Sequence, residues 1–579
     1  MKKNNIIKSI TISYLKDGYE NGLFSPLDIC VEIVRRVEAT LHMNIWITKP
    51  KLENLIPYID NLMKMDKEKA PLWGIPFAIK DNIDLINVPT TAGCEGYKYI
   101  PEESSTVVKL LIEAGAIPLG KTNLDQFATG LVGTRSMYGE THNALKGKLI
   151  SGGSSSGSAV CVAMGQAAFS LGTDTAGSGR VPAALNNLVG LKSSIGAWST
   201  KGVVPACASL DCVTVLTNNL DDAIKVDKVV RLFDEDCPWS NPSKPISKTI
   251  PEKIYIPKLE LTFFGPYEKQ YREKWNSVVG KLKSLNIEIE YIDYSLFAEA
   301  AAILYDGPWI AERWASLGQF IEKNKGAGMV EVTETILKNG NNTNLKAESV
   351  FKAMHRLGEI KVKVKKILHN AVLIMPTVGG TYTRAEVDSD PINTNSNLGL
   401  YTNHCNLLNL TALDFQAGWI EEDVPFGLTS FALDNCEGLN FGMAGVYQRN
   451  DTEEVTTTLA VCGLHMRGFQ LEKQLIGLDG AFIREAKTAA IYKFLKLPTN
   501  PSKPGLIKVQ ADGGSIEVEL WSMPTKNIGL FLSYIQAPLG LGSIQLDDGQ
   551  EVTGFICEGY MENISEDITK YSSWRNIHE

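Results

Sequence analysis

The residues of this chain that are most able to do chemistry lie between Lys80 and Asp211. Two Gly/Ser-rich segments occur there, SGGSSSGS at 151–158 and GTDTAGSGRVP at 172–182, and Lys80 ends an earlier apolar run. A serine hydroxyl is a weak nucleophile near neutral pH and needs a base. A lysine can be that base if burial lowers its pKa. The pattern is therefore compatible with a hydrolase that uses serine and lysine.

Each of these features also has a simpler explanation. A serine in a Gly-rich turn is usually a turn residue or a helix cap, and a lysine at the end of a strand is usually solvated. A Gly/Ser-rich loop often cradles phosphate, but neither segment continues into a Lys-Ser/Thr pair at the P-loop offset. Nucleotide binding by these loops is therefore disfavoured, and a catalytic role depends on the wider pattern.

Taken in order, these segments resemble the amidase signature family over roughly residues 10–445. The resemblance implies a Ser-Ser-Lys triad with Ser178 as the nucleophile, Ser154 as the bridging serine after a cis peptide bond, and Lys80 as the base. The oxyanion hole would consist of the backbone N–H groups of Thr175, Ala176, Gly177 and Ser178. The residues that support these loops would be Asp174, Arg180 and Ser155.

The chain departs from the usual family pattern at two positions. Ser156 stands where a glycine usually follows the serine pair, and Ala176 stands in the Gly-Gly-Ser stretch before the arginine. Glycines around the nucleophile let N–H groups converge on the developing oxyanion, a contribution of roughly 3–4 kcal/mol per donor. Alanine has less backbone freedom than glycine, so the geometry of this loop is the point to check.

The substrate is suggested by a second resemblance, to allophanate hydrolases, in the segment AAAILYDGPWIAER at 300–313. This resemblance implies that Tyr305 and Arg313 hold the substrate, with Gly130 as a further contact. Arginine suits a planar carboxylate because its fork donates two parallel hydrogen bonds. The alternative is a surface helix whose Arg313 pairs with Glu312 or with solvent.

A third resemblance covers about residues 456–565 and is to the small domain appended to allophanate hydrolases, whose fold is similar to that of gamma-glutamyl cyclotransferases. It implies a two-step route. The first domain releases ammonia from allophanate through a seryl acyl-enzyme and leaves N-carboxycarbamate, and the small domain assists the loss of carbon dioxide. His465, which follows a predicted strand, is the candidate for this second step, although a lone histidine is more often structural.

Composition restricts the remaining possibilities. A net charge of −9 without a basic tract gives no reason to expect nucleic-acid binding. The ten cysteines are scattered with no C-x-x-C pair, no secretion signal is visible, and the longest apolar stretch, 159–171, is too short to span a bilayer. We therefore expect a cytoplasmic protein without membrane contact.

The resemblance further implies no metal or other cofactor, a homodimer, and a urea carboxylase as fused or separate partner. Two alternatives stay open, namely an amidase of this family that acts on another amide, and an amidotransferase-type subunit that works only with partners.

The elements that must position these residues are predicted from apolar periodicity. Ser25-Pro26 predicts a helix start, and apolar runs at 74–79, 116–120, 159–164 and 167–172 alternate with Gly-rich turns, which indicates an α/β domain. A polar stretch at 447–455 indicates a linker, and short strands follow, separated by turns such as 498–505. We expect a large domain at 1–450 with a mixed sheet covered by helices, and a small α+β domain at 456–579.

Overall fold

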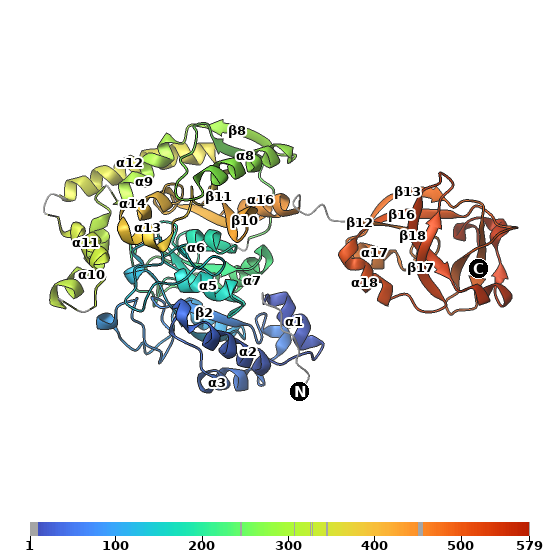
Figure 1. Ribbon diagram of the computed structural model, residues 1–579, viewed down its shortest axis with the longest axis horizontal. Coiled ribbons are helices and arrows are strands. Elements are labelled where there is room, and N and C mark those ends of the chain that lie inside the picture. The colour runs from blue at the N-terminus through green and yellow to red at the C-terminus, as the bar shows by residue number, and fades with distance from the viewer. Residues whose placement is uncertain are drawn as a thin grey trace. The chain divides into compact units, whose positions relative to one another are not determined.

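The computed structural model describes residues 10–577 except 244–245, 306, 325, 327, 343–345 and 450–455, and only the backbone of residues 305 and 526. By its internal contacts the chain divides into two units, residues 1–448 (unit 1) and residues 449–579 (unit 2). Each unit has its own sheets and its own apolar core, as the colours of Figure 1 make easy to follow.

Unit 1 is built on one mixed sheet, which has eleven strands in the described residues, in the order β1-β3-β2-β4-β6-β5-β10-β11-β9-β7-β8. Strand β2 pairs in parallel with β3 and β4, and β7 pairs in parallel with β8 and β9, whereas the other neighbours are antiparallel. The strands are β1 (Trp46–Thr48), β2 (Pro76–Lys80), β3 (Ile117–Thr122), β4 (Phe169–Asp174), β5 (Val189–Lys192), β6 (Cys212–Thr217), β7 (Lys253–Pro257), β8 (Glu288–Ile292), β9 (Ala371–Pro376), β10 (Leu410–Glu421) and β11 (Val424–Leu433).

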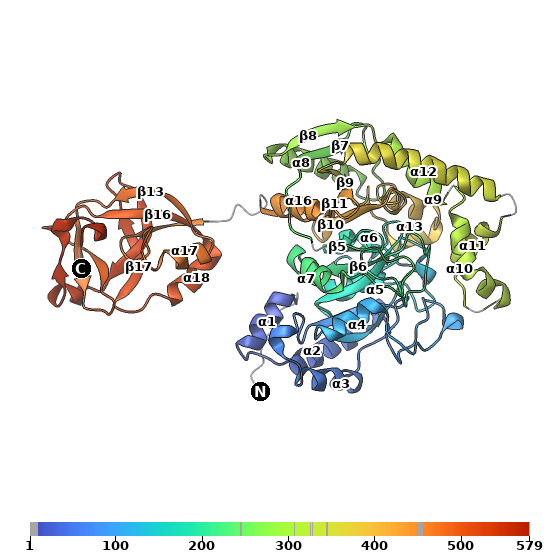
Figure 2. The ribbon, with the colours of Figure 1, turned by 180° about the vertical axis from the view of Figure 1, so that it is seen from behind.

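Unit 1 also contains helices, several of which cover this sheet. They are α1 (Ile12–Glu20), α2 (Pro26–Ala39), α3 (Leu52–Leu62), α4 (Thr106–Glu113), α5 (Ser156–Ala163), α6 (Arg180–Leu185), α7 (Leu220–Val230), α8 (Glu268–Ser284), α9 (Ser295–Tyr305), α10 (Ile310–Lys323), α11 (Glu331–Lys338), α12 (Ala347–Ile367), α13 (Arg384–Ser389), α14 (Asn393–Leu398), α15 (His404–Leu407) and α16 (Glu437–Arg449). Helix α5 contacts β2, β3, β4 and β6, and α6 contacts β5, β10 and β11. Figure 2 shows α4 and α7, which also pack on each other, from behind. The expected α/β fold with a helix-covered mixed sheet is confirmed.

The central strands are continuous apolar runs because both faces of the sheet are covered. Every residue of β2, β3, β4, β5, β6 and β9 is buried. The predicted helix start at Ser25 is also confirmed, since Ser25 and Asp28 form a capping box before α2. The run 159–164 belongs to α5 rather than to a strand, because a short apolar run does not by itself distinguish a buried helix from a buried strand.

Unit 2 contains a five-stranded sheet, β13-β16-β12-β18-β17, and a three-stranded sheet, β15-β14-β19, in its described residues. Its elements are β12 (Thr456–Val461), α17 (Glu472–Gly477), β13 (Ala481–Lys487), β14 (Tyr492–Leu497), β15 (Lys503–Lys508), β16 (Glu517–Pro524), α18 (Thr525–Ser533), β17 (Leu539–Gln545), β18 (Glu551–Cys557) and β19 (Glu566–Asp567).

Two predictions about the small unit were partly wrong. The expected turn at 498–505 ends early, because β15 begins at Lys503 and pairs with β14. Residues 447–449 of the expected linker are the last residues of α16, and the rest of that linker lies outside the described residues. Among the helices that the structure describes, none is long and apolar enough to cross a membrane.

Candidate active site

The predicted catalytic residues meet at one edge of the unit 1 sheet. Strands β2 and β4 are parallel neighbours, so Lys80 at the end of β2 and Asp174 at the end of β4 lie at the same edge. The loop after β4 carries Ser178, and the loop before α5 carries Ser154. The backbone N–H of Ser155 donates to the carbonyl of Ser178 at 3.2 Å, which ties the two serine loops together.

Lys80 is fully buried and makes two short hydrogen bonds. Its Nζ donates to Ser154 Oγ and to Thr173 Oγ1, each at 2.7 Å. Burial lowers the pKa of Lys80 to about 7, although the negative charges of Asp125, Asp211 and Asp174 partly oppose this effect. Near neutral pH a large fraction of this lysine is therefore uncharged and able to accept a proton.

Ser154 and Ser178 are both buried, one in each of the two Gly/Ser loops, and the peptide bond Gly153–Ser154 is cis. Ser178 Oγ donates to the carbonyl oxygen of Gly130 at 3.5 Å, which is a weak bond. Within the described residues the two serine hydroxyls are not hydrogen-bonded to each other, whereas the link from Ser154 to Lys80 is formed. Catalytic hydrogen bonds are often long without substrate, so this geometry leaves the relay possible.

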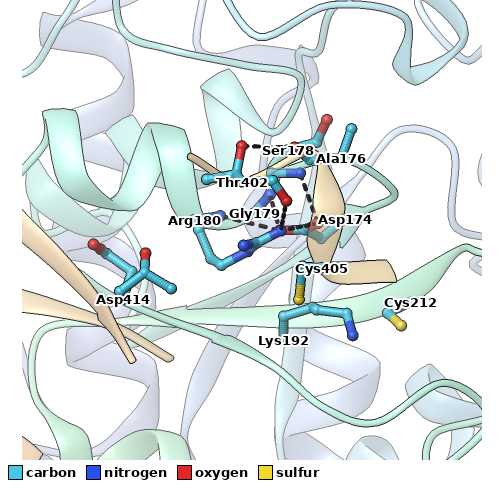
Figure 3. A network of polar contacts seen from close by, with 12 residues as sticks. Asp174, Ala176, Ser178, Gly179, Arg180, Lys192, Cys212, Thr402, Cys405 and Asp414 are labelled. Atoms are coloured by element: carbon cyan, nitrogen blue, oxygen red, sulfur yellow. Dashed lines mark hydrogen bonds and ion pairs between the residues drawn. The ribbon is translucent and has the colours of Figure 1, made fainter. Parts of the chain in front are cut away.

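A buried ion pair shapes the loop around Ser178. Arg180 donates from Nε and Nη2 to the two carboxylate oxygens of Asp174 at 2.9 and 3.0 Å, and neither side chain is exposed. Burial alone would raise the pKa of Asp174, but the charge and hydrogen bonds of Arg180 hold it below its usual value. Asp174 also accepts from the backbone N–H groups of Gly177 and Gly179, and Figure 3 shows Asp174 with Arg180 and Gly179. The carboxylate therefore bends the loop around itself.

The same hydrogen bonds determine which backbone N–H groups of this loop stay available to a substrate. The N–H of Gly177 is used by Asp174 at 2.8 Å. The N–H groups of Thr175, Ala176 and Ser178 have no hydrogen-bond acceptor within the described part of the chain. Gly177 has a φ of 128°, and a Cβ there would lie 2.3 Å from Thr402 Oγ1, whereas Ala176 is not among the positive-φ residues. Glycine is thus required at 177 and not at 176, which explains why the alanine is tolerated.

The predicted substrate residues lie on α9, α10 and the loop that contains Gly130. Arg313 on α10 is 2% exposed and donates from Nη1 to Thr129 Oγ1 at 3.0 Å. Its burial excludes the solvent-exposed alternative, and Glu312 accepts from the N–H and hydroxyl of Ser209. Tyr305 is the last residue of α9, but its side chain lies outside the described part, so its role stays a prediction.

A cavity of about 470 Å³ lies beside the loop that contains Gly130. It is lined by Thr129 and Gly130, by small residues of α9 such as Ala301, and by Asn395 and Asn403 from around α14 and α15. Ser178 does not line this cavity, but its hydroxyl donates to the carbonyl of Gly130, a residue of the lining.

Several supporting residues were missed by sequence reasoning. Thr173, the second partner of Lys80, directly precedes Asp174 and could have been noticed for that reason. Asp125 accepts from the N–H groups of Val132, Gly133 and Arg135 and so holds the Gly130 loop.

Two further hydrogen bonds to the loop around Ser178 come from residues 402–406, which are distant in sequence. The hydroxyl of Thr402 donates to the Ala176 carbonyl at 2.7 Å, and Asn406 donates to the Asp174 carbonyl at 2.8 Å. Nothing in the sequence connects residues 402–406 with the nucleophile loop. Only the folded chain brings these segments together.

One further motif has a structural rather than a functional explanation. The stretch GAIPLGKT at 115–122 has P-loop spacing, which the sequence reasoning overlooked. Its residues 117–122 form strand β3 instead of a loop before a helix. Lys121 is fully buried 3.4 Å from the Asp81 carboxylate and donates to Thr90. This lysine is therefore used inside the protein and does not face a phosphate site.

His465 lies in unit 2, in the loop after β12. Its Nε2 is 2.9 Å from Gln474 Oε1, and its ring stacks on Phe555 with centroids 5.1 Å apart. Burial lowers the pKa of His465, so the ring is neutral near pH 7. The histidine faces a cavity of about 240 Å³ that belongs entirely to unit 2.

Comparisons with known proteins agree with this geometry. Residues 30–438 match the amidase family, and residues 457–579 match the allophanate hydrolase C-terminal domain. The urea amidolyase of Saccharomyces cerevisiae is 38% identical over 577 residues, which cover 93% of this chain and 31% of that protein. The urea amidolyase of Lachancea kluyveri is 40% identical over 552 residues, which cover 88% of this chain and 30% of that protein.

Among solved structures, the allophanate hydrolase of Kluyveromyces lactis superposes with a TM-score of 0.71 at 36% identity and covers 98% of both chains. The chain spans about a third of the length of the curated urea amidolyases that it matches. The amidase match takes in most of unit 1, and the match to the C-terminal domain takes in most of unit 2. The chain therefore belongs to the amidase family and carries an allophanate hydrolase C-terminal domain.

Proposed function

We propose that this chain hydrolyses allophanate to ammonia and carbon dioxide, with unit 1 cutting the amide C–N bond and unit 2 assisting the loss of carbon dioxide. The observation that carries the first step is the buried Lys80, with a pKa near 7, bonded to Ser154 beside Ser178. A buried, partly neutral lysine with a serine between it and a second serine is suited to activate that second serine.

In the first step, Ser178 Oγ attacks the amide carbon of allophanate while its proton passes to Ser154 and the proton of Ser154 passes to neutral Lys80. The developing oxyanion accepts hydrogen bonds from the N–H groups of Thr175, Ala176 and Ser178. The C–N bond then breaks, and the proton held by Lys80 returns through Ser154 to the leaving nitrogen, which departs as ammonia. Water attacks the acyl-enzyme by the same route and releases N-carboxycarbamate.

The substrate assignment rests on charge. Allophanate carries a carboxylate next to the scissile amide, and Arg313 supplies a buried cation near the Gly130 loop. Asp174, Arg180 and Ser155 act only indirectly, because they hold the two serine loops in place. Tyr305 would add a hydroxyl to the carboxylate site.

In the second step, N-carboxycarbamate loses one carboxyl group as carbon dioxide. The C–N bond breaks, its electron pair stays on nitrogen, nitrogen takes up one proton from water, and carbamate remains. His465 is the residue of unit 2 that we assign to this step, since it is a neutral donor and acceptor at the wall of a cavity. Carbamate then breaks down to ammonia and a second carbon dioxide.

The wider setting follows from the relatives. A urea carboxylase, fused or separate, would supply allophanate, since the matched relatives are urea amidolyases. We further propose that residues 1–450 and 456–579 act as the two functional domains, in a cytoplasmic homodimer.

The deciding experiment measures ammonia release from allophanate, malonamate and a neutral amide by the wild type and by Ser178→Ala. We expect rapid turnover of allophanate that the substitution abolishes, and weak turnover of the neutral amide. Turnover of the neutral amide alone would instead support a general amidase. Activity only after addition of partner subunits would support an amidotransferase-type subunit.

A further inference from the structure

The cavity of unit 2 has a charge pattern that the assignment of His465 does not use. Its lining includes the cation of Lys503 and the amide of Gln474, and no aspartate or glutamate lines it among the described residues. Lys503 is half-buried, and its Nζ forms no hydrogen bond or ion pair with the part of the chain that the structure describes. A lone cation at the wall of a cavity is a recognition element for an anion.

Lys503 and His465 come from different elements that are locked against each other. Lys503 begins β15, and His465 lies in the loop after β12. A Cβ on Gly463 would lie 2.1 Å from Cγ of Pro504, so glycine is needed where these two segments meet. The positive charge of Lys503 also adds to the effect of burial in lowering the pKa of His465, which places the ammonium within electrostatic reach of the ring.

Apolar side chains also line the cavity. Phe555 stacks on the His465 ring, and Leu471 and Leu539 also line the space. The volume of about 240 Å³ suits a molecule of a few heavy atoms with some water. The cation of Lys503 among apolar groups favours a ligand with two charged ends, of which one pairs with the cation and the other loses its charge in the reaction.

Since the proposed second step places N-carboxycarbamate in this cavity, we propose that Lys503 is the residue that holds its retained carboxylate beside His465. This inference rests on the proposed function and adds a positioning residue to the second site. The carboxyl group that leaves as carbon dioxide lies against the apolar side chains of the lining, where loss of its charge is favoured. Its C–N electron pair stays on nitrogen, which takes a proton from water, while Lys503 keeps the carbamate carboxylate in place.

The test follows ammonia and carbon dioxide separately during turnover of allophanate by the full chain. Lys503→Met should slow carbon dioxide formation about tenfold or more, because a charge-assisted contact is lost, and leave the first ammonia release within about twofold. Lys503→Gln should behave like Lys503→Met, and Lys503→Arg should retain most of the rate. Lys508→Met, at the exposed far end of β15, is the matched control and should equal the wild type.

A binding measurement gives a second readout. Malonate has the same spacing between its carboxylates, so it should shift the ring NMR signals of His465 in the wild type but not in Lys503→Met. His465→Ala identifies those signals and reports on the second step itself.

The two proposals fail in different ways. If His465→Ala slows carbon dioxide formation and the Lys503 variants do not, the role of Lys503 is wrong and the function of unit 2 stands. If neither substitution changes carbon dioxide formation, neither His465 nor Lys503 takes part in the second step, and both assignments are wrong. Equal loss of the first ammonia release in Lys503→Met would show general damage and would also overturn the inference.

Discussion

The protonation of Lys80 should set the pH dependence of ammonia release. With a pKa of about 7, half of the enzyme carries the neutral lysine at pH 7. A lysine at its ordinary pKa of 10.5 would be neutral in only about 1 molecule in 3,000 at that pH. Burial of Lys80 therefore contributes roughly a thousandfold to the fraction of enzyme that is ready to react, provided that the neutral amine is the base.

The assay is kcat/KM for ammonia release between pH 5.5 and 9.5, with malonamate as a second substrate. The neutral lysine is the active form, so activity should rise with pH, with an apparent pKa near 7, and should level off above about pH 8. Below pH 6 it should fall about tenfold per pH unit. Lys80→Arg keeps the charge but does not deprotonate in this range, so it should lower kcat/KM by at least about a thousandfold at every pH.

A rate that still rises tenfold per unit through pH 9 would refute the reasoning, because it would show an unshifted lysine. Stability gives an independent check. The folded-state pKa of Lys80 is depressed, so between about pH 7 and 10.5 the unfolded chain binds the extra proton. The free energy of unfolding of the wild type relative to Lys80→Met should therefore increase with pH in that window, by up to about 1.4 kcal/mol per unit. A constant difference would contradict the shift.

Three further substitutions test the rest of the site. Ser178→Ala should abolish release of both ammonia and carbon dioxide. It should change the free energy of unfolding by less than about 1 kcal/mol, since the hydroxyl makes only a 3.5 Å bond. A large decrease of this free energy in urea denaturation would contradict the prediction. Arg313→Lys should raise KM for allophanate about tenfold to hundredfold, because bidentate carboxylate binding is lost. A neutral amide serves as the control substrate, and an equal rise in its KM would argue against a carboxylate contact. Asp174→Asn leaves the buried Arg180 without its counter-charge and should lower the free energy of unfolding, measured by urea denaturation, by about 3–5 kcal/mol. A decrease below about 1 kcal/mol would show that the ion pair does not hold the loop.

Local chemistry explains which structural features the sequence could predict. The capping box at Ser25 needs only residues three apart, and the apolar run at 74–79 becomes β2 with a shift of two residues. The run 159–164 could not be assigned by the same means, since a buried helix and a buried strand are both apolar throughout. The start of β15 was hidden because Pro and Gly at 504–505 normally indicate a turn, and here they lie within a paired strand.

The sequence by itself determined which residues we propose as the triad, because Lys80, Ser154 and Ser178 lie in an ordered series of motifs. The tertiary structure decided the environment on which the proposed reactivity of these residues depends. The pKa of Lys80 depends on its complete burial. The geometry of the amides around Ser178 depends on the bond that Asp174 accepts from the Gly177 N–H and on the bond that Thr402 donates to the Ala176 carbonyl. Burial, charge and hydrogen-bond partners belong to the whole fold, so spacing along the chain could name the residues but not their state.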